Sequence, residues 1–292
     1  MASGRLPDFI GVGAMKCGTT SLHYYLSLHT EIAVSRTKEL NFFIGDDAPA
    51  VPDGHANWSR GEAWYRSRFP TGPKVCGELS PEYCGGAWRD AVAERIRRMV
   101  PQARLLLLVR EPLARLRSHY LMALGNLDIE PVPFAEFVAS PAYDAYLSHS
   151  RYGSQLACLL DRFPREQVLV IESEALDLDR GPTLTRIFGH LGVDPAFHSP
   201  GFRRRLFVGR SRRLPTPLGR RLLGSKPLQF AWEALPFSLY ERLRDLVLVP
   251  FTAPPPSFEL PAQVRCRLED ELRHEIDLAR ELSGEPLASL GP

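Results

Sequence analysis

The sequence predicts an α/β protein with a P-loop-like three-layer fold, in which a mostly parallel central sheet is flanked by helices. Three observations support this fold: apolar strand-like runs alternate with helical patterns, 44% of the residues are hydrophobic, and 292 residues suffice for one such domain. The strand-like runs lie near residues 7–13, 31–35, 74–79, 104–109 and 168–172. The helical patterns lie near residues 19–28, 60–69, 87–100, 112–125, 150–163 and 183–191. An amphipathic helix is expected over residues 260–282, and residues 1–292 are interpreted as a single domain.

The first strand leads into a glycine-rich turn and then into a helix. This stretch starts at position 7 and reads PDFIGVGAMKCGTTSLHYYL. Gly18 lets the backbone turn tightly, and Thr19, Thr20 and Ser21 open the helix, whose free N–H groups attract anions. Lys16 adds a full positive charge to the same hollow. The pattern therefore predicts a binding site for a phosphate or sulfate group.

The turn departs from the phosphate-binding loop of ATPases and GTPases, in which lysine directly follows the second glycine. Here Thr19 occupies that position, and the lysine stands at position 16. A magnesium-dependent kinase also needs an acidic residue at a strand end, whereas the strand at 104–109 is followed by Arg110. The five cysteines show no metal-ligand spacing, so no metal is expected. A nucleotide kinase or NTPase stays open as an alternative, as does a non-catalytic nucleotide-binding module.

A second anion-binding motif is predicted where the strand at 104–109 runs into the next helix. Arg110 lies at the strand end, and Ser118 follows about two helical turns later, so both can face one ligand. An arginine at the carboxyl edge of a parallel sheet suits a phosphate dianion, and a serine hydroxyl adds a hydrogen bond. The chain thus has two separate candidate binding sites for anionic groups.

With these motifs the sequence resembles the sulfotransferases that use 3′-phosphoadenosine-5′-phosphosulfate (PAPS), in particular the heparan sulfate sulfotransferases and their bacterial relatives. The resemblance covers about the first two-thirds of the chain, in the order and spacing of that family. Its blocks are GAMKCGTTSL (13–22), KELNFF (38–43), RGEAWYRSRFP (60–70), LLLLVREPLARLRSHY (105–120) and SRYGSQLACLLDRFPREQVLVIESEAL (150–176). The first block resembles the family's 5′-phosphosulfate loop, and the fourth resembles its 3′-phosphate motif. PAPS is charged at both of these ends, whereas ATP has one contiguous triphosphate, so two anion sites suit PAPS better.

The resemblance implies roles for individual residues. Glu39 would be the catalytic base, in an apolar and partly polar setting supplied by Asn41, Phe42 and Phe43 that raises its pKa, and Lys16 would stabilise the leaving phosphate. A surface glutamate without a catalytic role is the alternative for Glu39. The implied nucleotide-binding residues are Lys16, Cys17, Gly18, Thr19, Thr20, Ser21, Arg110, Ser118, Tyr152, Gly209 and Arg210. The candidates on the acceptor side are Glu78, His23, Trp64 and Tyr65.

One position departs from the heparan sulfate enzymes, which carry a Glu-Lys pair in the strand after the aromatic helix. The corresponding stretch is GELSPEY (77–83), in which Glu78 is kept and Leu79 replaces the lysine. A site without that cation is expected to bind a less anionic acceptor than a sulfated glycosaminoglycan, with Glu78 as a second carboxylate. We therefore expect transfer of the PAPS sulfuryl group to a hydroxyl, and in second place to an amine, of a carbohydrate, glycolipid or secondary metabolite.

A basic segment over residues 201–221 holds eight arginines, in a chain whose formal net charge is only +2. We interpret it as a lid-like segment that contacts the nucleotide; a solvated basic face and peripheral contact with a membrane are the alternatives. Nucleic acid is not expected as a partner. The sequence shows no signal-like or membrane-spanning apolar run, so a cytoplasmic location is expected, while the oligomeric state is not predicted.

Overall fold

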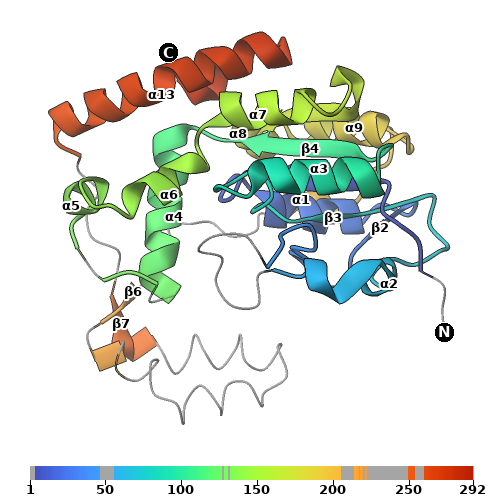
Figure 1. Cartoon of the computed structure of the whole chain (residues 1–292), viewed down its shortest axis with the longest axis horizontal. Coiled ribbons are helices and arrows are strands. Elements are labelled where there is room, and N and C mark those ends of the chain that lie inside the picture. The colour runs from blue at the N-terminus through green and yellow to red at the C-terminus, as the bar shows by residue number, and fades with distance from the viewer. Residues whose placement is uncertain are drawn as a thin grey trace.

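The chain folds around one sheet with helices on both sides, as a computed structural model of it shows (Figure 1). The structure describes residues 4–46, 56–126, 128–130, 132–204, 214–216, 218–219, 221, 249–253 and 260–291. All structural statements below concern these residues.

The five strands of the central sheet run parallel to one another. They are β1 (Phe9–Gly13), β2 (Ile32–Val34), β3 (Val75–Leu79), β4 (Arg104–Val109) and β5 (Val168–Glu172), in the spatial order β2-β3-β1-β4-β5. A separate antiparallel pair joins β6 (Leu214–Pro215) to β7 (Thr252–Ala253). Because the carboxyl ends of parallel strands meet at one edge of a sheet, the turns that follow β1, β3 and β4 lie side by side.

Helices cover both faces of the sheet. They are α1 (Thr19–Ser27), α2 (Gly61–Arg66), α3 (Arg89–Met99), α4 (Pro112–Asn126), α5 (Phe134–Val138), α6 (Tyr143–Ser148), α7 (Tyr152–Leu160), α8 (Ser173–Leu178), α9 (Arg180–Leu191) and α13 (Ala262–Ser283). The chain crosses from β1 to β2 through α1, and in the opposite direction from β3 to β4 through α3. Such crossovers are right-handed, so α1 and α3 lie on opposite faces. In Figure 1, α13 lies along α7, which in turn contacts α3.

The centre of the core is the run of leucines in β4. Leu105, Leu106, Leu107 and Leu108 are fully buried, which is the pattern of a parallel strand covered on both faces. Just after the end of α1, the ring of His29 lies 4.6 Å from that of Phe188 in α9, so the loop after α1 packs against this helix. The core is therefore a continuous apolar layer on each side of the sheet.

The predicted fold class is confirmed: the central sheet is parallel and helices flank it. The five predicted strands and the predicted C-terminal helix are present with bounds close to those expected. The short helices α5, α6 and α8 were not predicted. They span five or six residues each, which is too short for a helical period to emerge from the sequence.

Gly77 marks a close approach between β3 and β1, which yields a prediction about stability. A Cβ atom added at Gly77 would lie 2.3 Å from the backbone oxygen of Phe9, its partner in the sheet. We expect Gly77→Ala to force the two strands apart and lower the free energy of unfolding by about 1–3 kcal/mol in urea denaturation. The matched control is Gly72→Ala, because a Cβ there meets no atom within 4 Å. Equal stability of the two variants would contradict the expected crowding.

Candidate active site

The loop between β1 and α1 presents an open helix N-terminus. Gly18 is the N-cap of α1 and adopts a left-handed φ of 91°. No side chain caps the helix, and its first turn contains no acidic residue. The first N–H groups of a helix have no partner within the helix, so those that begin with Thr19 are available to a ligand. Thr20 and Ser21 are half-buried at the same end. This end of α1 is a suitable cradle for an anion.

The neighbouring helix α4, unlike α1, has a side chain that caps its N-terminus. The carboxylate of Glu111 accepts hydrogen bonds from the N–H groups of Leu113 (2.8 Å) and Ala114 (2.6 Å). A negative charge of the protein itself therefore occupies the N-terminus of α4. Of these two helices, which start at adjacent strand ends, only α1 keeps its N-terminus without a side-chain cap.

Lys16, Arg110 and Ser118 come together beside this loop. Lys16 adopts a left-handed φ of 71°, a conformation that is costly for a residue with a Cβ atom and that is often found at functional sites. Its Nζ lies 3.3 Å from the sulfur of Met122 in α4, and its carbonyl accepts a hydrogen bond from the Arg110 guanidinium at 3.2 Å. Ser118 lies one helical turn before Met122 and thus on the same face of α4. Three residues predicted to bind the nucleotide are therefore neighbours.

The buried side chains of Tyr152 and Cys17 connect the loop between β1 and α1 to the end of β4. The Tyr152 hydroxyl donates to the carbonyl of Arg110 (2.9 Å), accepts from its N–H (3.3 Å) and lies 3.6 Å from the Cys17 sulfur. Both side chains are fully buried, and burial raises the pKa of the Cys17 thiol to about 11. The polar atoms of these two residues, both predicted to contact the nucleotide, join the loop to the end of β4.

A buried arginine adds positive potential beneath the loop. Arg115 is fully buried and donates to the Ser150 hydroxyl (2.6 Å) and the Tyr146 carbonyl (2.6 Å) and contacts His119 Nδ1 (3.2 Å). Within the described residues, no carboxylate pairs with it. Burial and the charges of Arg115, His149 and Lys16 hold the pKa of His119 well below its usual range, so His119 is neutral near pH 7.

Glu39 lies in a setting different from the predicted one. An apolar and partly polar setting was predicted, whereas its side chain is exposed and forms an ion pair with Lys38. The apolar side chains that follow it are buried in the core instead. Like Lys16, Glu39 adopts a left-handed φ, of 59°. The residue is thus held in a constrained backbone conformation while its carboxylate faces solvent.

The segment 38–43 is fastened to the turn that follows β3, and that turn is fastened to β1. The N–H of Asn41 donates to the Ser80 hydroxyl at 3.0 Å. The N–H of Ser80 donates to the carbonyl of Gly11 (2.9 Å), and that of Cys84 donates to the carbonyl of Val12 (3.0 Å). The turn 80–84 therefore connects the segment that carries Glu39 with β1, the strand that leads into the loop between β1 and α1.

Glu78, predicted on the acceptor side, lies inside the protein and is held by several hydrogen bonds. It is fully buried in β3, and its carboxyl accepts hydrogen bonds from Tyr65 (2.7 Å), Ser80 (2.6 Å) and Tyr83 (2.9 Å). Burial raises the pKa of Glu78, and these hydrogen bonds oppose the rise. Tyr65 is also fully buried, and its ring stacks on Phe42 at 4.1 Å, so it too belongs to the core.

The structure also shows the surroundings of Trp64 and Leu79, two positions singled out from the sequence. Trp64 is half-buried on α2, with the guanidinium groups of Arg60 and Arg68 at 5.0 Å and 4.5 Å from its ring. Leu79, which stands where the heparan sulfate enzymes carry lysine, is fully buried in β3. The side chain at this position is therefore part of the sheet packing.

His23 and Glu82 complete the surroundings of Glu39. His23 lies on α1 one turn after Thr19; burial lowers its pKa, and the charges of Lys38 and Glu39 act on it. Glu82, in the turn after β3, was missed by the sequence analysis. Burial raises the pKa of its carboxyl to about 7, and the negative charge of Glu39 contributes to this rise. No local sequence pattern marks it, because its burial and its relation to Glu39 arise only in the folded chain.

The predicted lid-like segment is described only in part. Gly209 and Arg210 lie outside the described residues. At its start, the Tyr25 hydroxyl donates to the carbonyl of Arg204 at 2.8 Å, and the Arg204 guanidinium lies over the ring of Tyr24. This contact joins the beginning of the basic segment to α1, which also carries the anion loop.

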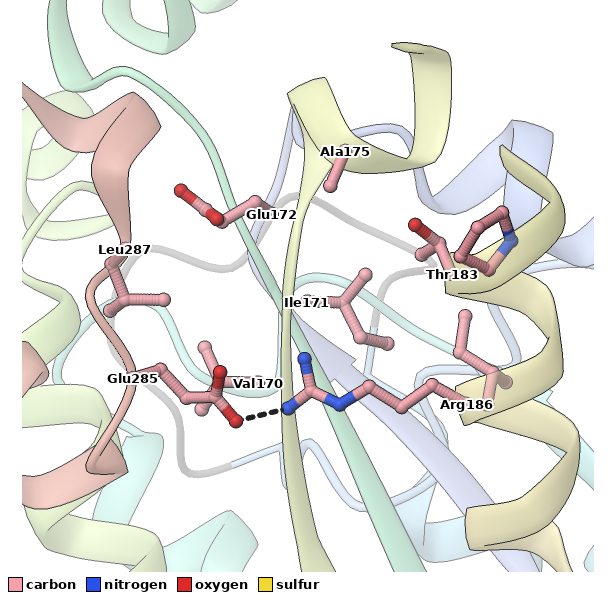
Figure 2. A pocket seen from close by; sticks show the side chains of 10 residues that line it. Val170, Ile171, Glu172, Ala175, Thr183, Arg186, Glu285 and Leu287 are labelled. Carbon is pink, nitrogen blue, oxygen red and sulfur yellow. Dashed lines mark hydrogen bonds and ion pairs between the residues drawn. The ribbon is translucent and has the colours of Figure 1, made fainter. Parts of the chain in front are cut away.

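A hollow of about 180 Å³ lies away from all these residues. It is bounded by β5, α9 and the C-terminal turn, and Figure 2 shows the ion pair of Arg186 with Glu285 across it. None of the residues predicted to bind nucleotide or acceptor lines it. Elsewhere in the described part of the chain, no group of three or more His, Cys, Asp or Glu residues is arranged to hold a metal ion. No described helix is long and apolar enough to cross a membrane.

Comparison with solved structures identifies the class of this fold. A sulfotransferase from Alicyclobacillus acidocaldarius matches with a TM-score of 0.68 and 24% identity, over 98% of this chain and 99% of that one. The mouse sulfotransferase SULT7A1, solved in complex with PAP, matches with a TM-score of 0.52 and 14% identity, over 97% and 89% of the two chains. The chain therefore has a sulfotransferase fold.

The similarity in sequence narrows the relationship. Human heparan sulfate glucosamine 3-O-sulfotransferase 5 is 29% identical over 203 residues, which are 65% of this chain and 55% of that protein. The chain thus spans about half the length of this relative. No family model matches the chain. The predicted resemblance to the heparan sulfate sulfotransferases is confirmed by this similarity in sequence, and the solved structures confirm the fold.

The pKa of Glu82 gives a prediction about stability and pH. A carboxyl whose pKa rises from 4.5 to about 7 on folding stabilises the folded state at low pH, and this contribution is lost as the pH rises through 7. We expect the free energy of unfolding of the wild type to fall by on the order of 1–2 kcal/mol between pH 5 and pH 8 relative to Glu82→Gln. Parallel curves for the two proteins in urea denaturation across this range would contradict the prediction.

Proposed function

We propose that the chain is an enzyme that transfers the sulfuryl group of PAPS to a hydroxyl of a carbohydrate, glycolipid or secondary metabolite, with an amine as the second choice of acceptor. The observation that carries this proposal is the uncapped N-terminus of α1 with Lys16, Arg110 and Ser118 beside it. The turn 80–84 joins this donor side to the segment that carries Glu39. The relatives and the solved structures named above are sulfotransferases, which supports the same activity.

The residues present fit a nucleotide with anionic groups at two ends. The N–H groups of α1 and Lys16 suit the 5′-phosphosulfate, and Arg110 with Ser118 suits the 3′-phosphate. Arg115 lies buried near both without a carboxylate partner among the described residues, so a bound anion would compensate its charge. The PAP bound to mouse SULT7A1, which shares this fold, is a nucleotide of this kind.

PAPS supplies a sulfuryl group that is activated by its bond to the 5′-phosphate. Lys16 would donate a hydrogen bond to the bridging oxygen and neutralise the charge that develops on the phosphate as the S–O bond breaks. Glu39 would accept the proton of the acceptor hydroxyl while that oxygen forms its new bond to sulfur. Arg110 and Ser118 would fix the far end of the nucleotide and thereby hold the sulfur in line with the acceptor. Lysine and backbone N–H groups supply the positive charge, so we expect activity without a metal.

The donor site is tested by calorimetric titration with 3′-phosphoadenosine-5′-phosphate (PAP) in the presence of EDTA. We expect Arg110→Ala to bind PAP about 10- to 100-fold more weakly than the wild type, because one or more charge-assisted hydrogen bonds are lost. Arg97→Ala is the matched control, since Arg97 is exposed on α3 and pairs with Glu94. Stronger binding of ATP with magnesium than of PAP would overturn the proposal and favour a kinase.

The catalytic base is tested with Glu39→Gln. We expect turnover to fall by roughly 10²-fold or more, because the amide cannot accept the acceptor's proton, while PAP binding stays unchanged. Turnover is measured as transfer of labelled sulfate from PAPS across a panel of neutral sugars, amino sugars and aryl alcohols. Glu166→Gln, at an exposed position beside β5, is the control. Wild-type turnover in Glu39→Gln would exclude this residue as the base.

A further inference from the structure

The N-terminus of α7 is capped by a side chain from α13. The N-cap residue of α7, Arg151, forms no side-chain cap, and the first turn contains no acidic residue. Instead, the carboxylate of Glu275 in α13 accepts hydrogen bonds from the N–H of Ser154 (2.7 Å) and from the Ser154 hydroxyl (2.6 Å). Ser154 is the third residue of α7, so Glu275 satisfies one of the N–H groups that a helix leaves without a partner.

The two helices are also in close contact at this point, where α13 lies along α7 (Figure 1). A Cβ atom added at Gly153 would lie 2.6 Å from the backbone oxygen of Glu275 and 2.8 Å from the Cβ atom of Leu278. The carboxylate of Glu271, one helical turn before Glu275, lies 3.8 Å from the guanidinium of Arg151. The first turn of α7 is therefore fixed by two carboxylates of α13 and by direct packing.

The same turn of α7 carries Tyr152, which connects it to the proposed donor site. The Tyr152 hydroxyl donates to the carbonyl of Arg110 at 2.9 Å and accepts from the N–H of Arg110 at 3.3 Å. The Arg110 guanidinium in turn donates to the carbonyl of Lys16 at 3.2 Å. Hydrogen bonds and a single helical turn thus lead from Glu275 to Lys16.

The buried Tyr152 ring transmits the position of α7 to this hydroxyl. Tyr152 is fully buried, and its hydroxyl stands at the end of a rigid ring, so a shift of the first turn of α7 moves the hydroxyl with it. Hydrogen bonds weaken when their distance and angle depart from the preferred values. Because both bonds are made to the backbone of Arg110, such a shift would loosen the end of β4, whose side chain is proposed to bind the 3′-phosphate.

Resting on the proposed function, we propose that Glu275 is a positioning residue for the sulfuryl donor. By capping α7 it holds Tyr152 in place and thereby fixes Arg110 and the Lys16 loop before the nucleotide binds. A group that is already fixed loses less freedom when its ligand binds, so the affinity is higher than that of a loose site. The resemblance to the heparan sulfate sulfotransferases covers about the first two-thirds of the chain, and Glu275 lies beyond it.

The experiment is calorimetric titration with PAP of the full chain and of Glu275→Ala, at a temperature well below the unfolding midpoint of both proteins. We expect the variant to bind PAP about 3- to 10-fold more weakly, because the cap that holds α7 is lost. Glu269→Ala is the matched control and should bind PAP as the wild type does. Glu269 is exposed on the same helix and pairs with Arg265.

A double-mutant cycle separates positioning from a general loss of stability. Tyr152→Phe removes the hydroxyl that connects α7 to Arg110, so Glu275→Ala should cause no further loss of affinity when it is added to Tyr152→Phe. If Glu275→Ala does not fold, Ser154→Ala takes its place in both backgrounds. This change removes one of the two hydrogen bonds to Glu275 and should weaken PAP binding in the same direction.

Two results would overturn this inference and leave the donor site intact. One is wild-type affinity for PAP in the folded variant, and the other is an equal loss of affinity with and without the Tyr152 hydroxyl. Absence of PAP binding by the folded wild type would instead overturn the proposed function, and the inference with it.

Discussion

The buried carboxyl of Glu78 holds together α2, the turn after β3 and the segment 38–43. Tyr65 from α2, Ser80 and Tyr83 from the turn after β3 all donate to it, and it lies fully inside the protein. Two of these hydroxyl groups also bind the segment 38–43. Ser80 accepts a hydrogen bond from the N–H of Asn41, and Tyr83 accepts one from the N–H of Phe43. One carboxyl thus fixes the places of both Glu39 and Glu82. Removing one partner of such a buried network leaves the others unsatisfied, so its members depend on one another.

Charged side chains from different turns meet at one edge of the sheet. Lys16 and Arg110 lie beside the loop between β1 and α1, with the buried Arg115 close by. Glu39, paired with Lys38, belongs to the segment that is fastened to the turn after β3. The parallel sheet brings these groups together, because the ends of adjacent strands lie at one edge while each turn carries its own side chains.

The sequence predicted the sheet better than the acceptor side. Apolar runs such as residues 104–109 can only be buried strands, and the glycine-rich turn with Lys16 stays recognisable because its chemistry is local. The role of Glu78 was not predictable, since it depends on the Tyr65 hydroxyl, which only the packing of α2 brings to it. Glu39 was expected in an apolar and partly polar setting from its neighbours in the sequence, yet its side chain is exposed and pairs with Lys38. Glu82 is defined by its distance from Glu39 in space, which no local pattern records.

The positive charges beside the loop between β1 and α1 repel one another in the free protein, and a bound anion would offset this repulsion. Burial lowers the pKa of Arg115, and the nearby charge of Arg110 lowers it further, so these two groups repel each other in the folded chain. The positive charge of Lys16 also helps to lower the pKa of His119. Like charges brought together in a partly desolvated place weaken the fold unless an anion joins them. A nucleotide with phosphates at both ends would remove this repulsion at two points, so the positive charge that strains the free protein is the charge that would bind the donor.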